Sequence, residues 1–434
     1  MFAQFARSSS MNDISIVVKS LRSRRLSTVI TAASVAVATA LLLTMLSLRT
    51  ASFEAFQRGT GTTHLLVSAD SSPLTAVLNG VFYANAPSNP ISWAKYQEIK
   101  NAFPYDWAVP TQQGDSFRGY PVAAVGPEFF TRFEPVRGEP WQLAQGQFPS
   151  KPFEICLGST AAVGSGLRLG QKVFLTHGSG TSREGEHAHE HAEYPFTVVG
   201  ILQPSGSAHD RVLFTDLDSS WILHAQDRRE REGVEGLTTL ADLKDEDRKI
   251  TGILLRLPTR PGRDASAAIQ QQFDALRRDT AIVVAQPAQQ IDRLRSIIGN
   301  IDELFIALGV AVLLSSGISI LLSMHNSMAE RRKQIALLRA LGVARMRITG
   351  MILTEATLIG FAGAIGGCAL SLIGNAIASG ALKTRIGLVV DPTLDPRSTV
   401  IIVAGAIVLS ALAGVLPAIT AYRTSVADNL RPEA

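Results

Sequence analysis

Four stretches of the chain carry no charged side chain over a length that can cross a lipid bilayer. They are Leu26–Leu48 and, after a long polar interval, about Leu304–Met324, Ala356–Leu382 and Ser398–Tyr422. A helix rises about 1.5 Å per residue, so each stretch can span a hydrocarbon core about 30 Å thick. The pattern predicts four transmembrane helices, one before and three after a water-compatible segment of residues 49–298.

The water-compatible segment has the mixed pattern of an α/β domain. Helical patterning covers Ser92–Ala102 and Ala265–Arg278, and short apolar runs near Gly, Pro, Asn or Ser predict strands. The predicted strands are His64–Ala69, Val122–Gly126, Thr197–Leu202, Val212–Thr215, Ile253–Leu257 and Ala281–Ala285. Charge runs at 227–232 and 242–249 are expected to be solvated. The predicted fold is a membrane protein with four transmembrane α-helices and a large mixed α/β domain inserted between helices 1 and 2.

Lysine and arginine gather on one side of the predicted spans. They precede span one, occupy the connection between spans two and three, and follow span four: Lys19, Arg22, Arg24, Arg25, Arg331, Arg332, Lys333, Arg339, Arg345, Arg347, Arg423 and Arg431. The positive-inside rule therefore places both termini and the 325–347 connection in the cytoplasm. The α/β domain then faces outward, into the periplasm of a Gram-negative cell. We expect a multi-pass protein of the bacterial inner membrane.

The predicted order of segments follows from these two patterns. It runs from a basic cytoplasmic segment 1–25 through transmembrane helix 1 at 26–48, the periplasmic domain at 49–298, transmembrane helix 2 at 299–324, a cytoplasmic connection at 325–347, transmembrane helix 3 at 348–382, a short periplasmic loop at 383–397 and transmembrane helix 4 at 398–422 to a cytoplasmic tail at 423–434. The first span is longer than the apolar core of a signal peptide and lacks a small-residue cleavage site, so we expect an uncleaved anchor. Met1 and Met11 are alternative start sites.

The most specific cytoplasmic stretch is Glu330–Arg345. Ile335, Leu338 and Leu341 form an apolar stripe at helical spacing, and Gly342 is a good helix stop. Such an amphipathic helix either lies on the membrane surface or docks into a groove of a partner protein. Composition alone does not choose between these two interpretations.

The spans themselves favour close helix packing over a permeation path. No Asp, Glu, Lys or Arg lies inside the charge-poor stretches, so no ion or proton pathway is indicated. Span three instead carries Gly363 and Gly367 at G-x-x-x-G spacing, with Gly360 and Gly366 beside them. Small residues at this spacing let helices approach closely.

A histidine-rich run is the second unusual feature. His187, His189 and His191 alternate along the chain among four glutamates, so in an extended conformation their rings project to one side. Imidazole binds zinc and other transition metals, and His177 and His209 are further candidates if the chain folds back. The alternative is a solvated polar loop that binds no metal. The run does not match H-E-x-x-H, which argues against a zinc protease.

Several function classes are disfavoured by composition. The net charge of +4 does not indicate a nucleic-acid partner, because many basic residues flank the spans and suit membrane lipid instead. Cys156 and Cys368 fall in different predicted segments and cannot form a useful disulfide. No G-x-x-x-x-G-K-[ST] phosphate-binding loop and no coherent acid–base or nucleophile constellation is present, so we expect a non-catalytic protein.

The cytoplasmic and glycine motifs together resemble a known family. Glu330-Arg331-Arg332 through Arg339-Ala340-Leu341-Gly342, followed by Glu355-Ala356 and the glycines of 360–367, resembles the FtsX-like permease domain of macrolide-exporter (MacB) and lipoprotein-release ABC transporters. The resemblance covers about Asp292–Pro432, and Phe196–Leu202 with Asp210–Phe214 is similar to the family's periplasmic domain. Gln334 departs from the family, where Glu is frequent; we expect altered partner contacts.

The resemblance implies a function for the whole chain. Such permeases are dimers whose partner is a cytoplasmic ABC ATPase, often encoded separately, and they convert its ATP-driven closure into motion of their periplasmic domains, a mode called mechanotransmission. ATP and Mg would be bound only by that partner subunit. By analogy, the ATPase-coupling residues here are Glu330, Arg331, Arg332, Ile335, Leu338, Arg339, Leu341 and Gly342. A periplasmic adaptor or substrate protein is a further expected partner.

A second interpretation competes with this one. The histidine-rich run could instead make the chain a metal-responsive or metal-handling membrane protein, with a transition metal such as zinc at His187, His189 and His191. That hypothesis requires a metal-dependent change in the periplasmic domain, and the permease hypothesis does not. A periplasmic enzyme is the third and least supported class, since no catalytic constellation is present.

Overall fold

The protein was analysed as a computed structural model, which describes residues 13–87, 89–177, 191–259, 266–385 and 393–423. The chain forms two compact units. One, here the membrane unit, comprises residues 1–51, 298–380 and 391–434; the other, here the α/β unit, comprises residues 52–297 and 381–390. The predicted fold class is confirmed, since four helices are long and apolar enough to cross a membrane and a large α/β region separates the first from the rest.

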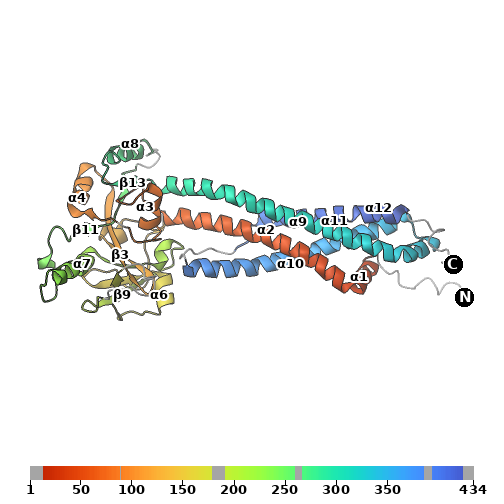
Figure 1. The fold of residues 1–434 in the computed structure, drawn as a ribbon, viewed down its shortest axis with the longest axis horizontal. Helices are drawn as coiled ribbons and strands as arrows, with labels where there is room; N and C mark the ends of the chain where they lie inside the picture. The colour runs from red at the N-terminus through yellow and green to blue at the C-terminus, as the bar shows by residue number, and fades with distance from the viewer. Residues whose placement is uncertain (1–12, 88, 178–190, 260–265, 386–392, 424–434) are drawn as a thin grey trace. The chain divides into compact units, whose positions relative to one another are not determined.

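The membrane unit is built from long helices that pack along one another. They are α1 (Asp13–Ser23), α2 (Arg25–Gly59), α9 (Pro287–Ala340), α10 (Arg345–Arg385), α11 (Pro396–Ala413) and α12 (Val415–Arg423). Figure 1 shows α2, α9, α10 and α11 running side by side. Their shared core includes Val35, Ile320, Ile359 and Ala406, and many other large apolar side chains point outward. An apolar exterior is expected of helices whose solvent is lipid.

Two helix ends follow directly from local sequence. α9 stops at Ala340, and Gly342 adopts φ +89°, a left-handed conformation that glycine tolerates best, so the predicted stop is confirmed. The predicted short amphipathic helix is therefore the last part of α9 and not a separate element. In the fourth span, α11 ends at Ala413 and α12 begins at Val415, just before Pro417. A proline removes the hydrogen bond to the residue four positions earlier, which explains the break.

In the described part of the chain, the α/β unit is organised around a sheet of eleven strands. Nine of them lie in the order β13-β1-β12-β3-β4-β10-β6-β9-β5, while β7 pairs with β9 and β8 pairs with β3. The strands are β1 (Leu65–Ser68), β3 (Trp107–Phe117), β4 (Tyr120–Val125), β5 (Leu143–Gly146), β6 (Glu154–Leu157), β7 (Lys172–Val173), β8 (Thr176–His177), β9 (Phe196–Leu202), β10 (Leu213–Asp216), β12 (Gly252–Arg256) and β13 (Val283–Ala285). A separate pair joins β2 (Ile91–Ser92) to β11 (Lys249–Ile250).

Hydrophobic cores cover both faces of the sheet. Successive side chains of a strand point to opposite faces, so Leu66 joins one core while Leu65 and Val67 join another. The covering helices are α3 (Pro73–Gly80), α4 (Trp93–Ala102), α5 (Glu128–Thr131), α6 (Ser159–Ser165), α7 (Leu217–Arg231) and α8 (Ser266–Leu276), with short 3-10 turns at Ala208–Arg211 and Leu240–Asp242. Strand β10 also contributes to a third core through Leu213.

All six predicted strands and both predicted helices are present in the structure, with ends shifted by a few residues. The most consequential miss is β3, the longest strand, which lies in the middle of the sheet. Its sequence contains Pro110, two glutamines, Gly114 and Asp115, so it lacks a strand-like pattern. Nearly all of its residues are nevertheless buried, because neighbouring strands cover both edges.

Candidate functional site

The turn between α9 and α10 exposes apolar side chains. Leu338 is 39% exposed, Leu341 81% and Met346 75%, and Leu337 is exposed beside them. We call these four residues the turn surface. Arg332 is also exposed, whereas Arg339 is half-buried. An apolar patch rimmed by basic residues at the end of a helix pair has the chemistry of a protein-docking surface.

Two of the residues expected to contact a partner face inward instead. Ile335 is buried in the core of the membrane unit. Arg331 Nη1 donates to Glu355 Oε2 at 3.0 Å, and its Nη2 donates to Glu355 Oε1 at 3.3 Å and to Ser20. Arg331 therefore joins α1, α9 and α10 within the membrane unit. The side chain of Glu330 lies outside the described residues.

The glycines of span three lie where α10 meets its neighbours. A Cβ added at Gly363 would come within 2.6 Å of Val35 Cβ, and one at Gly367 within 2.5 Å of Thr39 Cβ, both on α2. A Cβ at Gly360 would meet Ser410 Oγ of α11 at 2.2 Å, whereas one at Gly366 would make an ordinary 3.4 Å contact with Ala36. Three of the four glycines thus occupy places where a larger side chain would push helices apart.

The α/β unit contains a second, chemically different feature. Asp115 on β3 lies directly opposite His177 on the antiparallel strand β8. His191 precedes β9, and its backbone N–H donates to Leu175 O at 3.0 Å. His224 and Asp227 lie three residues apart on α7, so they share one helix face. We call these five residues, Asp115, His177, His191, His224 and Asp227, the His/Asp cluster.

His177 lies at the centre of the cluster. Its Nδ1 is 2.8 Å from Asp115 Oδ1, and its Nε2 is 2.6 Å from Asp227 Oδ2. Its ring meets that of His191 edge-on at 4.7 Å and stacks on that of His224 at 5.0 Å between centroids. His191 is 1% exposed and the Asp115 side chain 6%, whereas the His224 side chain is 30% exposed. The cluster is therefore closed on one side and open on the other.

Electrostatics within the cluster are strongly coupled. Hydrogen bonds to Asp115 and then to Asp227 raise the pKa of His177 to about 10, against the opposing effect of burial. Burial by itself would raise the pKa of Asp115 and Asp227, but the hydrogen bonds from His177 and the neighbouring histidines bring both below their ordinary values. In this arrangement His177 is an imidazolium between two carboxylates.

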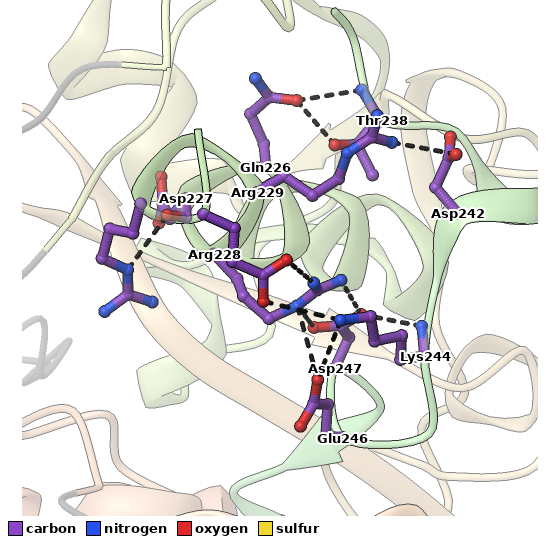
Figure 2. A network of polar contacts seen from close by, with 11 residues as sticks. Gln226, Asp227, Arg228, Arg229, Thr238, Asp242, Lys244, Glu246 and Asp247 are labelled. Atoms are coloured by element: carbon purple, nitrogen blue, oxygen red, sulfur yellow. Dashed lines mark hydrogen bonds and ion pairs between the residues drawn. The ribbon is translucent and has the colours of Figure 1, made fainter. Parts of the chain in front are cut away.

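An ion-pair network holds the part of α7 that carries the cluster (Figure 2). Arg228 Nε lies 2.7 Å from Asp247 Oδ1, and its Nη1 is 2.9 Å from Glu232 Oε2. Arg229 Nη1 is 3.0 Å from Asp242 Oδ1. The expectation that both charge runs are solvated is wrong for Arg228, Arg229 and Asp247, whose side chains are 15%, 14% and 4% exposed because α7 pairs with the following loop. It holds for Glu232 and Asp242, which are exposed. The network fixes the rotation of the helix that presents His224 and Asp227.

A cavity of about 870 Å³ opens on the exposed side of the cluster. His177, His224 and Asp227 line it, together with Gln112 and Gln113 of β3. Two groups of three ligand-type residues have donor atoms within 4.8 Å of one another: Asp115, His177 and His191, and His177, His224 and Asp227. These are the residues with the chemistry to hold a metal ion.

The sequence-predicted metal ligands are only partly in this cluster. His191 belongs to it, and so does His177, whereas His187 and His189 lie outside the described residues. His209 does not join it, because its ring is buried among aromatic side chains elsewhere in the unit. Sequence reasoning missed Asp115, His224 and Asp227. Only the i, i+3 spacing of His224 and Asp227 was a local signal, and Asp115 is brought in by sheet pairing.

Comparisons with known proteins agree with the two-part architecture. The family model of the MacB-like periplasmic core domain matches residues 28–301, and that of the FtsX-like permease C-terminal domain matches residues 306–426. The first model alone covers more than half of the chain.

Individual relatives are distant. The chain is 27% identical over 318 residues to a macrolide export ATP-binding/permease protein MacB of Shewanella sp. (strain ANA-3), covering 72% of this chain and 43% of that protein. It is 24% identical over 242 residues to an uncharacterized ABC transporter permease of Methanocaldococcus jannaschii, covering 55% of each. The chain thus spans about half the length of these relatives. Among solved structures, the extracellular domain of the ABC-type transporter YknZ from Gram-positive bacteria matches 46% of this chain and 96% of that domain, with 9% identity and a TM-score of 0.26.

Proposed function

This chain belongs to the family of ABC transporter permeases that combine a MacB-like periplasmic core domain with an FtsX-like C-terminal domain, and from that premise we propose that it converts ATP hydrolysis by an ABC ATPase into motion of its α/β unit. The ATPase is proposed to be a separate subunit that binds ATP and Mg. The permease subunit itself would be non-catalytic. Such coupling by mechanotransmission would drive export or the handling of a substrate in the cell envelope.

The observation that carries this proposal is the turn surface. Leu337, Leu338, Leu341 and Met346 expose apolar area beside arginines, on the side of the membrane that the positive-inside rule assigns to the cytoplasm. A cytoplasmic ATPase is the partner that the family relationship supplies for such a surface. Leu338 and Arg339 are its proposed central contacts, since Ile335 and Arg331 are engaged within the membrane unit.

The remaining parts of the proposal concern assembly and orientation. We propose that two copies form a dimer in the bacterial inner membrane, with both termini cytoplasmic and the α/β unit in the periplasm. α2 and α9 are the proposed levers, because each is a single helix that includes residues of both units. The four apolar stretches predicted from the sequence contain no Asp, Glu, Lys or Arg, which supports a lever mechanism over passage of a polar substrate between the spans.

Co-purification from the native cells tests the proposal. The chain is solubilised in mild detergent, and the proteins recovered with it are identified by mass spectrometry. We expect a P-loop ATPase with the wild-type chain and at least about tenfold less of it with the double variant Leu338→Asp/Arg339→Glu, because a buried unpaired carboxylate at a protein interface costs several kcal/mol. ATPase stimulation by the variant is expected to fall in parallel.

The control is Arg423→Glu, a charge reversal at an exposed position of α12 in the same unit. This variant should retain the ATPase, and all variants should reach the membrane in equal amount. Recovery of the ATPase with the double variant at the wild-type level would reject the turn surface as its docking site. Recovery of no ATPase with any form of the chain would reject the permease proposal itself.

A further inference from the structure

We propose that the α/β unit contains a binding site for a divalent transition-metal ion of the zinc class, formed by His177 and His224 with Asp227 and supported by Asp115. The four residues of the site lie outside the predicted histidine-rich run of residues 184–193. It is also independent of the proposed coupling to an ATPase, because it needs no partner to be occupied.

The separation of the donor atoms fits one metal ion. His177, His224 and Asp227 each offer a ligand atom within 4.8 Å of the other two. Bonds of about 2.0–2.1 Å in a tetrahedral zinc site place ligand atoms about 3.4 Å apart. His177 Nε2 and Asp227 Oδ2 lie 2.6 Å apart, so they would have to separate by about 0.8 Å to share a zinc ion, which small rotations about their χ angles accomplish. Two imidazoles and one carboxylate form a donor set that suits zinc and leaves a fourth position open.

His177 already has the second contact that metal-binding histidines need. A ligating imidazole almost always donates its other N–H to a carboxylate or carbonyl, which fixes the ring and its tautomer. Binding of an ion by Nε2 of His177 would release the Nε2 proton of the imidazolium, and Nδ1, which keeps its proton, lies 2.8 Å from Asp115 Oδ1. Asp115 is held in place by the pairing of β3 with β8 and by its burial, so this supporting contact is preorganised.

Buried polar atoms near His177 lack a partner in the described part of the chain. His224 Nε2 makes no hydrogen bond there, and Asp115 Oδ2 is 4.0 Å away. Gln112 Oε1 and Gln113 Nε2 also lack a hydrogen-bond partner among the described residues, and both residues line the cavity. Buried polar atoms normally find partners, so unsatisfied groups on the residues that line this cavity indicate a polar or ionic ligand.

Access and charge also suit a cation. The cavity of about 870 Å³ reaches His177, His224 and Asp227 from outside, so an ion has an entry path. Three basic residues, Arg228, Arg231 and Lys249, line the same cavity, and four acidic residues, Asp227, Glu230, Glu246 and Asp247, offset their positive charge. A purely structural ion-pair network is the competing explanation of the cluster. That network rests on the short contacts of His177 with Asp115 and Asp227, and His224 joins it only through a 4.0 Å approach to Asp115.

Zinc binding by the full-length chain tests the inference. The protein is purified in detergent with an affinity tag that contains no histidine, and Zn²⁺ affinity is measured by competition with a chromogenic chelator. Co²⁺ is then added in place of Zn²⁺, because its visible absorption bands report imidazole and carboxylate ligation. We expect one high-affinity site per chain, weakened about 100-fold or more by His224→Ala and by about 10- to 100-fold by Asp115→Asn.

Two controls separate this site from other histidines. His325→Ala removes an exposed histidine of α9, and His187→Ala/His189→Ala removes two histidines of the predicted run. Both variants should bind Zn²⁺ like the wild type. His224→Ala is the principal variant because its side chain is partly exposed and its removal should leave the fold intact, which tryptophan fluorescence checks.

Each outcome decides the matter. Loss of the site in His224→Ala and Asp115→Asn, with retention in both controls, supports the proposal. Unchanged affinity in folded His224→Ala overturns it and leaves the cluster as an ion-pair network. A loss confined to His187→Ala/His189→Ala also overturns it, in favour of the histidine-rich run. Stoichiometric binding that no variant weakens means adventitious binding only.

Discussion

At the scale of single residues, His209 shows how burial alone sets the protonation state of a side chain. It is 1% exposed, and its ring lies 5.5 Å from that of Phe133 and 5.6 Å from that of Trp141. Neither ring nitrogen has a hydrogen-bond partner among the described residues. Burial lowers the pKa of His209 to about 3, so the folded protein keeps it neutral.

This residue should make the α/β unit less stable in acid. The unfolded chain protonates His209 below its ordinary pKa of about 6.5, and the folded chain does not until about pH 3. Stability is thus present above pH 6.5 and is lost as the pH falls from 6.5 towards 3. Between pH 7 and pH 5 the loss from this group is about 2 kcal/mol. We expect His209→Phe to reduce the pH dependence by that amount.

Denaturant unfolding at pH 7 and pH 5 measures the change in the free energy of unfolding between the two pH values. Tryptophan fluorescence is a suitable probe, because all four tryptophans lie in the α/β unit. Part of the slope should persist, since burial and the charges of Arg256 and Arg137 lower the pKa of His64 to about 4 in the same window. His209→Leu serves as a second variant if phenylalanine overpacks the site. An unchanged pH slope in both variants would contradict the assignment.

At the scale of elements, close helix packing distinguishes positions that look alike in sequence. Gly367 and Gly405 are both glycines inside predicted spans. A Cβ at Gly367 would lie 2.8 Å from the backbone oxygen of Ala36 as well as against Thr39, whereas one at Gly405 meets nothing within 4 Å. Backbone atoms cannot move aside cheaply, so α10 and α2 would have to separate.

We therefore expect Gly367→Ala to destabilise the membrane unit by about 1–3 kcal/mol, the usual cost of overpacking. Gly405→Ala, the matched control, should be neutral or stabilising by up to about 1 kcal/mol, because alanine favours the helix. Thermal exposure of Cys368 to a thiol-reactive dye, in a Cys156→Ser background, reports unfolding of this unit alone. Equal melting temperatures for the two variants would refute the close-packing argument.

At the scale of the whole molecule, the proposed topology assigns the turn surface and the α/β unit to opposite sides of the membrane. Each of the two has an exposed leucine, Leu341 in the turn surface and Leu237 in the loop after α7 of the α/β unit. Single cysteines at these positions, in a chain with Cys156→Ser and Cys368→Ser, make the assignment testable.

A membrane-impermeant thiol reagent applied to cells with a permeabilised outer membrane should label Leu237→Cys. It should label Leu341→Cys only after the inner membrane is disrupted, because the positive-inside rule predicts a cytoplasmic location for that turn. Gel-shift or mass analysis of the labelled chain provides the measurement. Labelling of Leu341→Cys in intact spheroplasts would reverse the orientation and remove the turn surface from reach of a cytoplasmic ATPase.

Features of this protein that depend on near neighbours in the chain could be predicted from its amino-acid sequence. The four candidate spans could be predicted from uninterrupted apolar runs, because each charged residue in a span adds a large free-energy cost of membrane insertion. Gly342 and Pro417 set helix ends through their own backbone restrictions. The family-like motifs likewise predicted the MacB-like and FtsX-like regions that the comparisons identify.

Contacts between side chains that are distant in sequence became visible only in the folded protein. β3 is a strand because neighbouring strands bury it, and its pairing with β8 brings Asp115 to His177 across more than sixty residues of sequence. α7 adds His224 and Asp227 from another element. In the membrane unit, the sequence suggests that Arg331 is available to a partner protein, whereas in the structure it forms an ion pair with Glu355. Such contacts depend on sheet register and helix rotation, and these are set by the packing of the whole core, not by any local pattern.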